Sequence, residues 1–127
     1  MGQNMKVIKS IIPTESQEQC AVIKWADAQP GICGRLMAIP NGAHKLPASA
    51  AKFKREGLRP GVPDLFLPIA RQGFHGIWIE MKRSKGGVVS DVQADWVRFL
   101  RGESYEAYIC EGADETILTI KEYMGWQ

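Results

Sequence analysis

The chain has 127 residues, which suits one domain spanning residues 1–127. With 45% apolar residues a single core is feasible, and no apolar run approaches the roughly 18 residues that cross a membrane, so we expect no membrane partner. The net charge of +2 is too small to indicate a nucleic-acid partner, but the basic residues crowd between His44 and Lys85.

The three cysteines, Cys20, Cys33 and Cys110, form no CxxC pair and have no paired histidine spacing, so we expect no zinc site. Their odd number and the lack of a continuous apolar stretch at the N-terminus favour a reducing cytoplasm. We interpret them as buried or incidental thiols.

The first predicted helix runs from Glu15 to Ala28 and ends before Pro30. Thr14 can cap its start, because Gln17 stands at the capping-box position. At about 100° per residue, one face of this helix is apolar. The residues on that face are Val22, Trp25 and Ala26. Glu18 lies on the same face, either as a first-turn acid that the helix dipole favours or as part of a site.

A short apolar strand at Leu36–Ile39 ends in the turn Pro40–Gly42. A basic segment follows, with His44 and Lys45, and leads to a short helix at Ala48–Glu56. The basic residues in and after this helix are Lys52, Lys54, Arg55 and Arg59. His44 could be a catalytic base, but no acidic residue stands near it in the sequence, so phosphate contact or plain solvation is the favoured interpretation.

Two apolar strands, Gly61–Leu67 and Ile77–Lys82, form a predicted hairpin in the middle of the chain. In an antiparallel hairpin the start of the first strand lies beside the end of the second, and alternate side chains share a face. We therefore expect Asp64 to approach Glu80 and Lys82, which share one face of the second strand.

A basic loop at Arg83–Val89 leads to a helix at Asp91–Arg101, which Ser90 caps. Gln93 stands at the capping-box position and also on the buried face of this helix. The other residues of that face are Trp96, Val97 and Leu100. Gln93 is therefore either a cap or a residue of the site.

A fourth strand at Tyr105–Cys110, a turn at Glu111–Asp114 and a final helix at Glu115–Tyr123 follow. We expect three residues of this helix to face inward: Ile117, Leu118 and Ile120. Strands alternate with helices around a central hairpin, which predicts an α/β sandwich with a mixed sheet flanked by helices. The helix between the third and fourth strands predicts a right-handed parallel crossover.

If the helix of Glu18 packs over the same end of the sheet, three carboxylates and the Lys82 ammonium surround a small volume. Oxygen ligands without cysteine or paired histidine suit a hard cation such as Mg²⁺. The cation would lower the pKa of a bound water, and Lys82 would orient that water or stabilise charge on a phosphate oxygen. The alternative interpretation is structural: Asp64 would be a turn residue, and Glu80 and Lys82 would form an exposed pair on an edge strand.

The basic residues around this site match a phosphodiester polyanion. A glycosidase with paired carboxylates is an alternative, but it leaves Lys82 and the flanking basic residues unexplained.

The sequence resembles the PD-(D/E)XK nucleases, and within them the VRR-NUC branch. The residues that carry the resemblance are Glu18, Pro40-Asn41-Gly42, Gly57, Gly61-Val62-Pro63-Asp64-Leu65, Ile79-Glu80-Met81-Lys82, and Ser90 with Gln93. The resemblance covers the chain from about Glu15 to Tyr123 and is closest to stand-alone members carried by bacteriophages and prophages, which implies a bacterial cytoplasm.

The resemblance implies an αβββαβ core, Mg²⁺ or Mn²⁺ dependence and phosphodiester hydrolysis. Asp64 and Glu80 would be metal ligands, with the Met81 carbonyl as a further ligand and Lys82 as the catalytic lysine. Glu18 would ligate metal directly or through water, and Gln93 would be the supporting glutamine near the site.

Stand-alone members are understood as homodimers that cut branched DNA, so the resemblance implies a dimeric Holliday (four-way) junction resolvase. We expect DNA phosphates to contact His44, Lys45, Lys52, Lys54, Arg55, Arg59, Arg83 and Lys85. Candidates for an apolar dimer interface are Phe74, Trp78 and Trp126, with core packing as the alternative for Trp78. The rival functions are a flap or duplex endonuclease of the same fold and a non-catalytic DNA-binding module.

Overall fold

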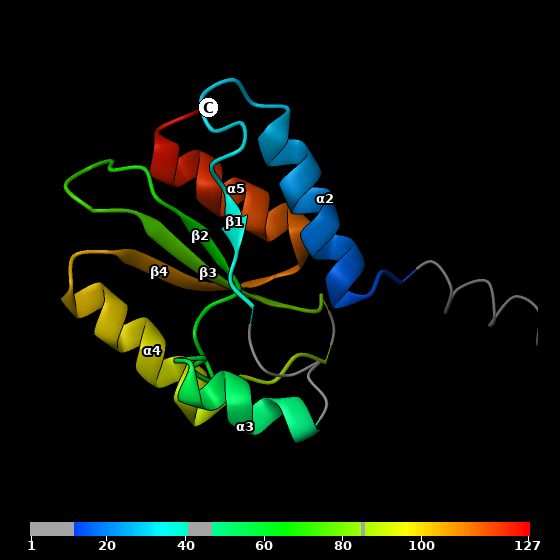
Figure 1. Ribbon diagram of the computed structural model, residues 1–127. Helices are drawn as coiled ribbons and strands as arrows, with labels where there is room; N and C mark the ends of the chain where they lie inside the picture. Colours follow the sequence, from blue (N-terminus) through cyan, green and yellow to red (C-terminus); the bar gives the residue numbers. More distant parts are fainter. Residues whose placement is uncertain (1–11, 41–46, 85) are drawn as a thin grey trace, which may run out of the picture.

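A four-stranded sheet in the order β1-β2-β3-β4 organises the chain, and the computed structural model describes residues 12–40, 47–84 and 86–127 (Figure 1). The strands are β1 (Met37–Ala38), β2 (Leu65–Leu67), β3 (Ile77–Lys82) and β4 (Glu106–Glu111). The first three strands pair antiparallel, and β3 and β4 pair parallel. The predicted mixed sheet is therefore confirmed.

The described helices are α2 (Glu15–Asp27), α3 (Pro47–Arg55), α4 (Asp91–Gly102) and α5 (Gly112–Met124). Together α2, the four strands and α4 give the predicted αβββαβ order, with α3 inserted between β1 and β2 and α5 added after β4. None of these described helices is long and apolar enough to cross a membrane.

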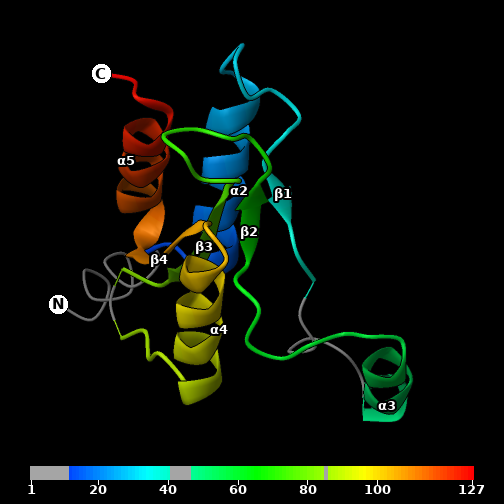
Figure 2. The same cartoon turned by 90° about the vertical axis from the view of Figure 1, so that its left-hand side faces the viewer.

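The sheet separates two helical layers, α2 with α5 on one face and α4 on the other (Figure 2). The alternation of side chains along β3 explains this arrangement. Ile77, Ile79 and Met81 belong to the core cluster that α2 and α5 cover, whereas Trp78 packs in the cluster under α4. Phe74 and Trp126, two candidates for a dimer interface, instead pack against the first of these clusters, half-buried.

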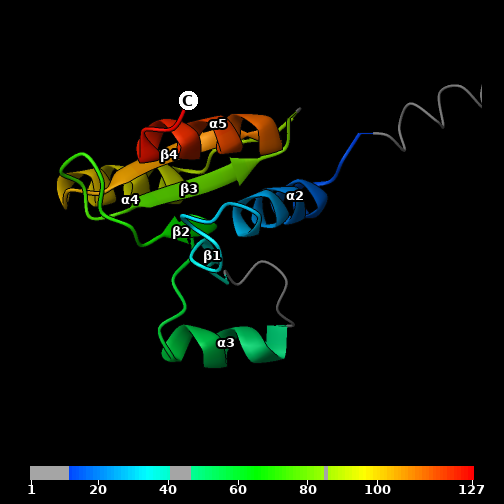
Figure 3. The same ribbon diagram turned by 90° about the horizontal axis from the view of Figure 1, so that it is seen from above.

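Helix α3 stands apart from the layered body of the molecule (Figure 3). The chain that follows α3 returns to α4, where the Trp96 indole Nε1 donates a hydrogen bond of 3.1 Å to the Pro60 carbonyl. Helix α3 is thus an arm attached to the body at the N-terminal half of α4.

Three expectations about the elements are wrong. Strand β2 begins at Leu65, not at Gly61, because Gly61 has a positive φ of 84° and Pro63 has no N–H to donate. Helix α5 already begins at Gly112, so the predicted turn at 111–114 is reduced to one glycine with a φ of 79°. Leu118 is 57% exposed, because it lies on the solvent side of α5.

Candidate active site

The hairpin brings Asp64 and Glu80 together, as the sequence predicts. Leu65 pairs with Ile79, so Asp64 stands opposite Glu80, and the Asp64 Oδ2 accepts a hydrogen bond of 2.9 Å from the Met81 amide. Both acids are buried, with exposed fractions of 7% for Asp64 and 3% for Glu80. Two carboxyl groups therefore share a nearly dry position at the end of the hairpin.

The electrostatics of this pair are unfavourable for two full negative charges. The pKa of Glu80 rises from 4.5 to about 8, first because burial removes water from the carboxylate and then because of the charge and hydrogen bond of Asp64. The Lys82 ammonium opposes this rise in pKa, while Glu15 adds a smaller increase. The site thus has affinity for positive charge beyond what Lys82 alone supplies.

Lys82 and Gln93 complete the group from β3 and α4. The Lys82 Nζ lies 2.8 Å from the Gln93 Oε1 and 3.6 Å from the Glu80 Oε2. The Gln93 Nε2 donates a hydrogen bond of 3.1 Å to the same Glu80 oxygen. Gln93 therefore holds both the lysine and the acid.

Gln93 is also the helix cap that its sequence position predicts. The Gln93 side-chain Oε1 accepts a 3.0 Å hydrogen bond from the Ser90 backbone N–H, and the Gln93 backbone N–H donates to the Ser90 Oγ at 3.2 Å. Gln93 is therefore both a helix cap and a residue of the site, because the capping turn of α4 lies directly over the end of β3.

The donor chemistry of this group fits a hard divalent cation. The Glu80 Oε1 is buried without a hydrogen-bond partner among the described residues, next to the Asp64 carboxyl group. Mg²⁺ in proteins is held by one or two carboxylates and keeps several waters, so two adjacent carboxylates suffice. A third acid is not at hand, since no group of three His, Cys, Asp or Glu able to hold a metal occurs in residues 12–40, 47–84 and 86–127.

Glu18 is the member of the predicted group that the structure does not bring in. It lies on α2, which packs on the Ile79 and Met81 face of β3, whereas Glu80 points to the opposite face. Its carboxylate lines a separate hollow of about 340 Å³ with Ser84 and Gly112. The expectation of three carboxylates around one small volume is therefore wrong for this structure.

The Glu18 carboxylate nevertheless occupies a fitted position at the same edge of the sheet. A Cβ atom on Gly112 would lie 2.9 Å from the Glu18 Oε1, so this carboxylate lies directly against the glycine at the junction of β4 and α5. The Glu18 Oε2 is buried and has no hydrogen-bond partner among the described residues. This oxygen requires a polar partner such as water.

Gly61 explains why Asp64 is so firmly placed. A Cβ atom at this position would fall 1.9 Å from the Val92 Cγ1, inside the first turn of α4. The segment before Asp64 therefore lies directly against the helix that supplies Gln93, and both sides of the site are fixed to each other.

The predicted DNA contacts fall into two groups. The described residues among them are all exposed: Lys52, Lys54, Arg55, Arg59 and Arg83. The first group lies on the projecting helix α3 and in the segment after it, which contains Arg59, and the second is Arg83, which directly follows β3. His44, Lys45 and Lys85 lie outside the described residues.

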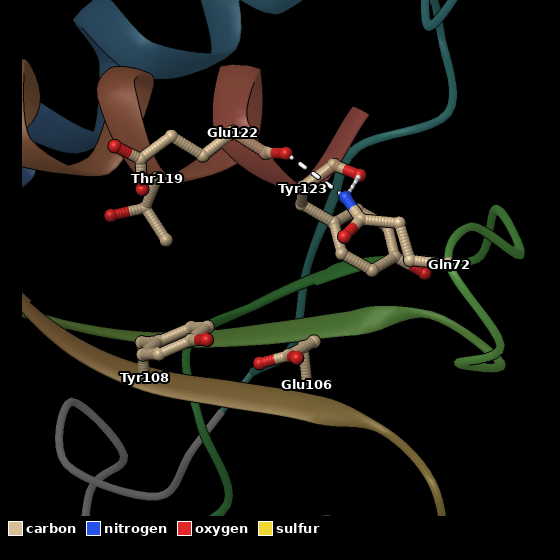
Figure 4. Close-up of a pocket in the computed structure, with 6 residues that line it drawn as sticks. All are labelled: Gln72, Glu106, Tyr108, Thr119, Glu122 and Tyr123. Carbon is tan, nitrogen blue, oxygen red and sulfur yellow. Dashed lines mark hydrogen bonds between the residues drawn. The ribbon is translucent and has the colours of Figure 1, made fainter. Parts of the chain in front are cut away.

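A different polar hollow, of about 210 Å³, lies at the other end of the sheet, where β4 begins and α5 ends (Figure 4). Its lining residues are Gln72, Glu106, Tyr108, Thr119, Glu122 and Tyr123. The Gln72 Nε2 donates hydrogen bonds to the carbonyls of Glu122 at 3.1 Å and Tyr123 at 2.8 Å. This side chain therefore closes the C-terminal end of α5, and the hollow contains none of the predicted site residues.

Sequence reasoning assigned no role to Glu15 or Phe66. Glu15 stands in the first turn of α2, close enough to the acidic pair to raise the pKa of Glu80. Phe66 stacks on Trp78 with ring centroids 4.1 Å apart, on the α4 side of the sheet. The signal for Phe66 was available, because it alternates with Leu65 and Leu67 and so shares a face with Asp64.

Comparisons with known proteins agree with this architecture. The model of the VRR-NUC domain family matches residues 2–114. A solved structure described as a VRR_NUC domain protein is 31% identical, with 89% of each chain covered and a TM-score of 0.79. No curated protein matches the chain. The predicted PD-(D/E)XK fold is confirmed by these findings.

Proposed function

The chain belongs to the VRR-NUC family of nuclease domains, and we propose that it is a Mg²⁺- or Mn²⁺-dependent endodeoxyribonuclease that cuts branched DNA as a homodimer. The observation that carries this proposal is the contact group of Asp64, Glu80, Lys82 and Gln93 at the end of the hairpin. The preferred substrate in this proposal is a Holliday (four-way) junction.

Asp64 and Glu80 would hold the divalent cation, with the Met81 carbonyl as a third oxygen. The Met81 amide already points to Asp64, and in a strand the carbonyl of a residue points to the same side as its amide. When bound, the cation lowers the pKa of a coordinated water and neutralises charge on the phosphate.

Glu18 enters the proposal as an acid that acts through water. Its buried, unpartnered Oε2 supports this role, because such an oxygen is satisfied by an ordered water. Its place at the same edge of the sheet as Lys82 follows from the parallel register, in which Lys82 pairs with Glu111 beside Gly112.

Lys82 would orient the attacking water and stabilise negative charge on the phosphate in the transition state. The Lys82 side chain is only 12% exposed and its ammonium is held by Gln93, so it is oriented before substrate arrives. Gln93 acts as a positioning residue, because it fixes the lysine and one oxygen of Glu80 at once.

The basic residues would hold DNA phosphates and so recognise charge and shape rather than base sequence. The proposed set comprises His44, Lys45, Lys52, Lys54, Arg55, Arg59, Arg83 and Lys85. The distance of α3 from the body supports an arm that reaches a second DNA segment beside the one at Arg83 (Figure 3). A substrate with two neighbouring duplexes, such as a junction, would satisfy both groups.

The test is a substrate panel. Purified protein is incubated with end-labelled four-way junction, flap and linear duplex, each with Mg²⁺, with Mn²⁺ and with EDTA. We expect metal-dependent cuts in the junction in preference to the other substrates. Equal cutting of linear duplex would overturn the branch preference, and no metal-dependent cutting of any substrate would leave only a DNA-binding module.

A further inference from the structure

Two adjacent valines project from the loop between β3 and α4. Val88 is 80% exposed and Val89 is 41% exposed, so Val88 is the most exposed large apolar side chain among the described residues. Single apolar side chains are common on protein surfaces and need no explanation. These two are neighbours in the chain, and their position relative to the active site gives them a possible use.

Both ends of this valine pair are held by residues of the candidate active site. On one side, Gly87 lies so close to the Lys82 stem that a Cβ atom on the glycine would stand 2.7 Å from the Lys82 Cβ. On the other side, the Ser90 backbone N–H donates a 3.0 Å hydrogen bond to the Gln93 Oε1, the atom that also contacts the Lys82 Nζ. The valines between Gly87 and Ser90 are therefore anchored at the rim of the site.

The chemistry of the two valines differs from that of the residues beside them. The exposed Arg83 suits a phosphate, whereas an isopropyl group gains nothing from contact with a hydrated phosphate. The apolar part of DNA is the face of a base, which the next base pair covers in a continuous duplex. At a branch point this stacking is interrupted, and apolar side chains of DNA-binding proteins can pack against unstacked bases.

The occupant of this rim is the substrate, because any other partner bound there would cover Lys82. The valine side chain also suits a rigid contact. It is branched at Cβ and stiff at χ1, so it loses little conformational freedom when it is buried.

We propose that Val88, supported by Val89, is a wedge that packs against the free base face at a branch point of the DNA. This inference deepens the proposed function, since it rests on the cutting of branched DNA and names a residue that selects the branch. Arg83 and the basic helix α3 contact phosphates, which every DNA structure presents. The wedge adds binding energy only where a base face is free, so it determines specificity.

The test compares DNA binding in EDTA, where the result does not depend on cleavage. Fluorescence anisotropy measures the affinity of the full chain for a four-way junction and for linear duplex of the same sequence. We expect Val88→Ser to lower the ratio of junction affinity to duplex affinity about 10-fold, the effect of no longer burying two methyl groups. Val88→Ile, which remains apolar and branched at Cβ, should keep the ratio of the wild type.

Leu118→Ser is the matched control, because Leu118 is also highly exposed, at 57%, but lies on α5. A second readout is a fluorescent adenine analogue placed at the branch point, whose emission reports its stacking. At saturating protein the wild type should change this emission, and Val88→Ser should change it less. Thermal melts check that each variant is folded.

The outcomes separate the wedge from the nuclease. An unchanged affinity ratio and unchanged emission in Val88→Ser, or an equal loss in Leu118→Ser, would overturn the wedge. If the wild type cuts junctions with Mg²⁺ and its branch preference does not depend on Val88, the wedge alone is wrong. If the preference depends on Val88 but no metal-dependent cutting occurs, the nuclease alone is wrong.

Discussion

Gln93 shows how one side chain can serve the fold and the site together. In the capping box of α4 the Gln93 backbone N–H donates a hydrogen bond and its side-chain Oε1 accepts one. The same side chain contacts Lys82 and Glu80. Helix α2 contains the same capping box, formed by Thr14 and Gln17, whose side-chain hydrogen bonds join these two residues and not Lys82 or Glu80. The molecule therefore contains its own control for separating the two roles of Gln93.

We predict that Gln93→Ala and Gln17→Ala each lower the free energy of unfolding by about 1 kcal/mol, the typical effect of losing a cap. Only Gln93→Ala should also slow DNA cleavage, by about 10- to 100-fold, as expected for a residue that orients a ligand. Urea denaturation and single-turnover cleavage measure the two effects. Equal cleavage rates for the two variants would show that Gln93 is only a cap.

Glu80 is the residue whose charge state depends most on its surroundings. Its pKa rises from 4.5 to about 8 on folding, so between these values the folded chain retains a proton that the unfolded chain releases. The contribution of Glu80 to the free energy of unfolding is therefore most favourable below pH 4.5. It falls as the pH rises from 4.5 to about 8, and above pH 8 the folded chain bears the full cost of the buried charge.

We predict that Glu80→Gln is more stable than the wild type in EDTA above pH 8, on the order of 1–3 kcal/mol, and that this difference disappears near pH 4.5. Adding Mg²⁺ should stabilise the wild type and leave the variant unchanged, because a ligand stabilises the state that binds it. Thermal melts across pH measure both effects. A variant that is less stable than the wild type at high pH in EDTA would contradict the assignment of paired carboxyl groups.

The segment before β2 depends on one glycine. Gly61 has a positive φ and lies against Val92, whereas Gly34 has a similar φ of 73° and open space within 4 Å of the point where a Cβ would stand. We predict that Gly61→Ala costs about 2 to 4 kcal/mol and Gly34→Ala about 1 kcal/mol, the difference being the overpacking against α4. Denaturant unfolding measures both, and equal losses would show that Val92 yields freely.

Helix α3 should act in DNA binding without contributing to the fold. We predict that the triple variant K52A/K54A/R55A keeps the thermal stability of the wild type but binds DNA more weakly. The slope of the logarithm of the binding constant against the logarithm of salt concentration should become shallower by about 2 to 3. The control removes equal charge at exposed positions elsewhere, namely Lys24, Arg35 and Arg71. Fluorescence anisotropy at several salt concentrations makes the comparison, and equal weakening by both variants would contradict a role specific to α3.

The elements that the sequence predicts best are those with strong local rules. The hairpin and the positions of Asp64, Glu80 and Lys82 follow from strand alternation and antiparallel pairing alone. The position of Glu18 could not be predicted in this way, because it depends on which face of the sheet α2 covers. The start of α5 was missed because one glycine at a positive φ makes the whole turn, where four residues were expected.

At the scale of the whole molecule, the sheet separates stability from chemistry. The face under α2 and α5 carries the larger core cluster, and the face under α4 carries Glu80, Lys82 and their partner Gln93. The basic arm α3 precedes these residues in the chain, and Arg83 directly follows Lys82. This division predicts that substitutions at the acidic pair abolish activity without unfolding the protein.

The most direct test is single-turnover cleavage of a labelled four-way junction by the wild type, Asp64→Asn and Lys82→Ala, each with Mg²⁺ and with EDTA. Exposed Glu103→Gln is the control for a carboxylate-to-amide change. We predict cutting by the wild type and the control only with Mg²⁺, and cutting at least about 100-fold slower by the two site variants, with junction binding retained. Cutting by Asp64→Asn at the wild-type rate, or by the wild type in EDTA, would contradict the central claim.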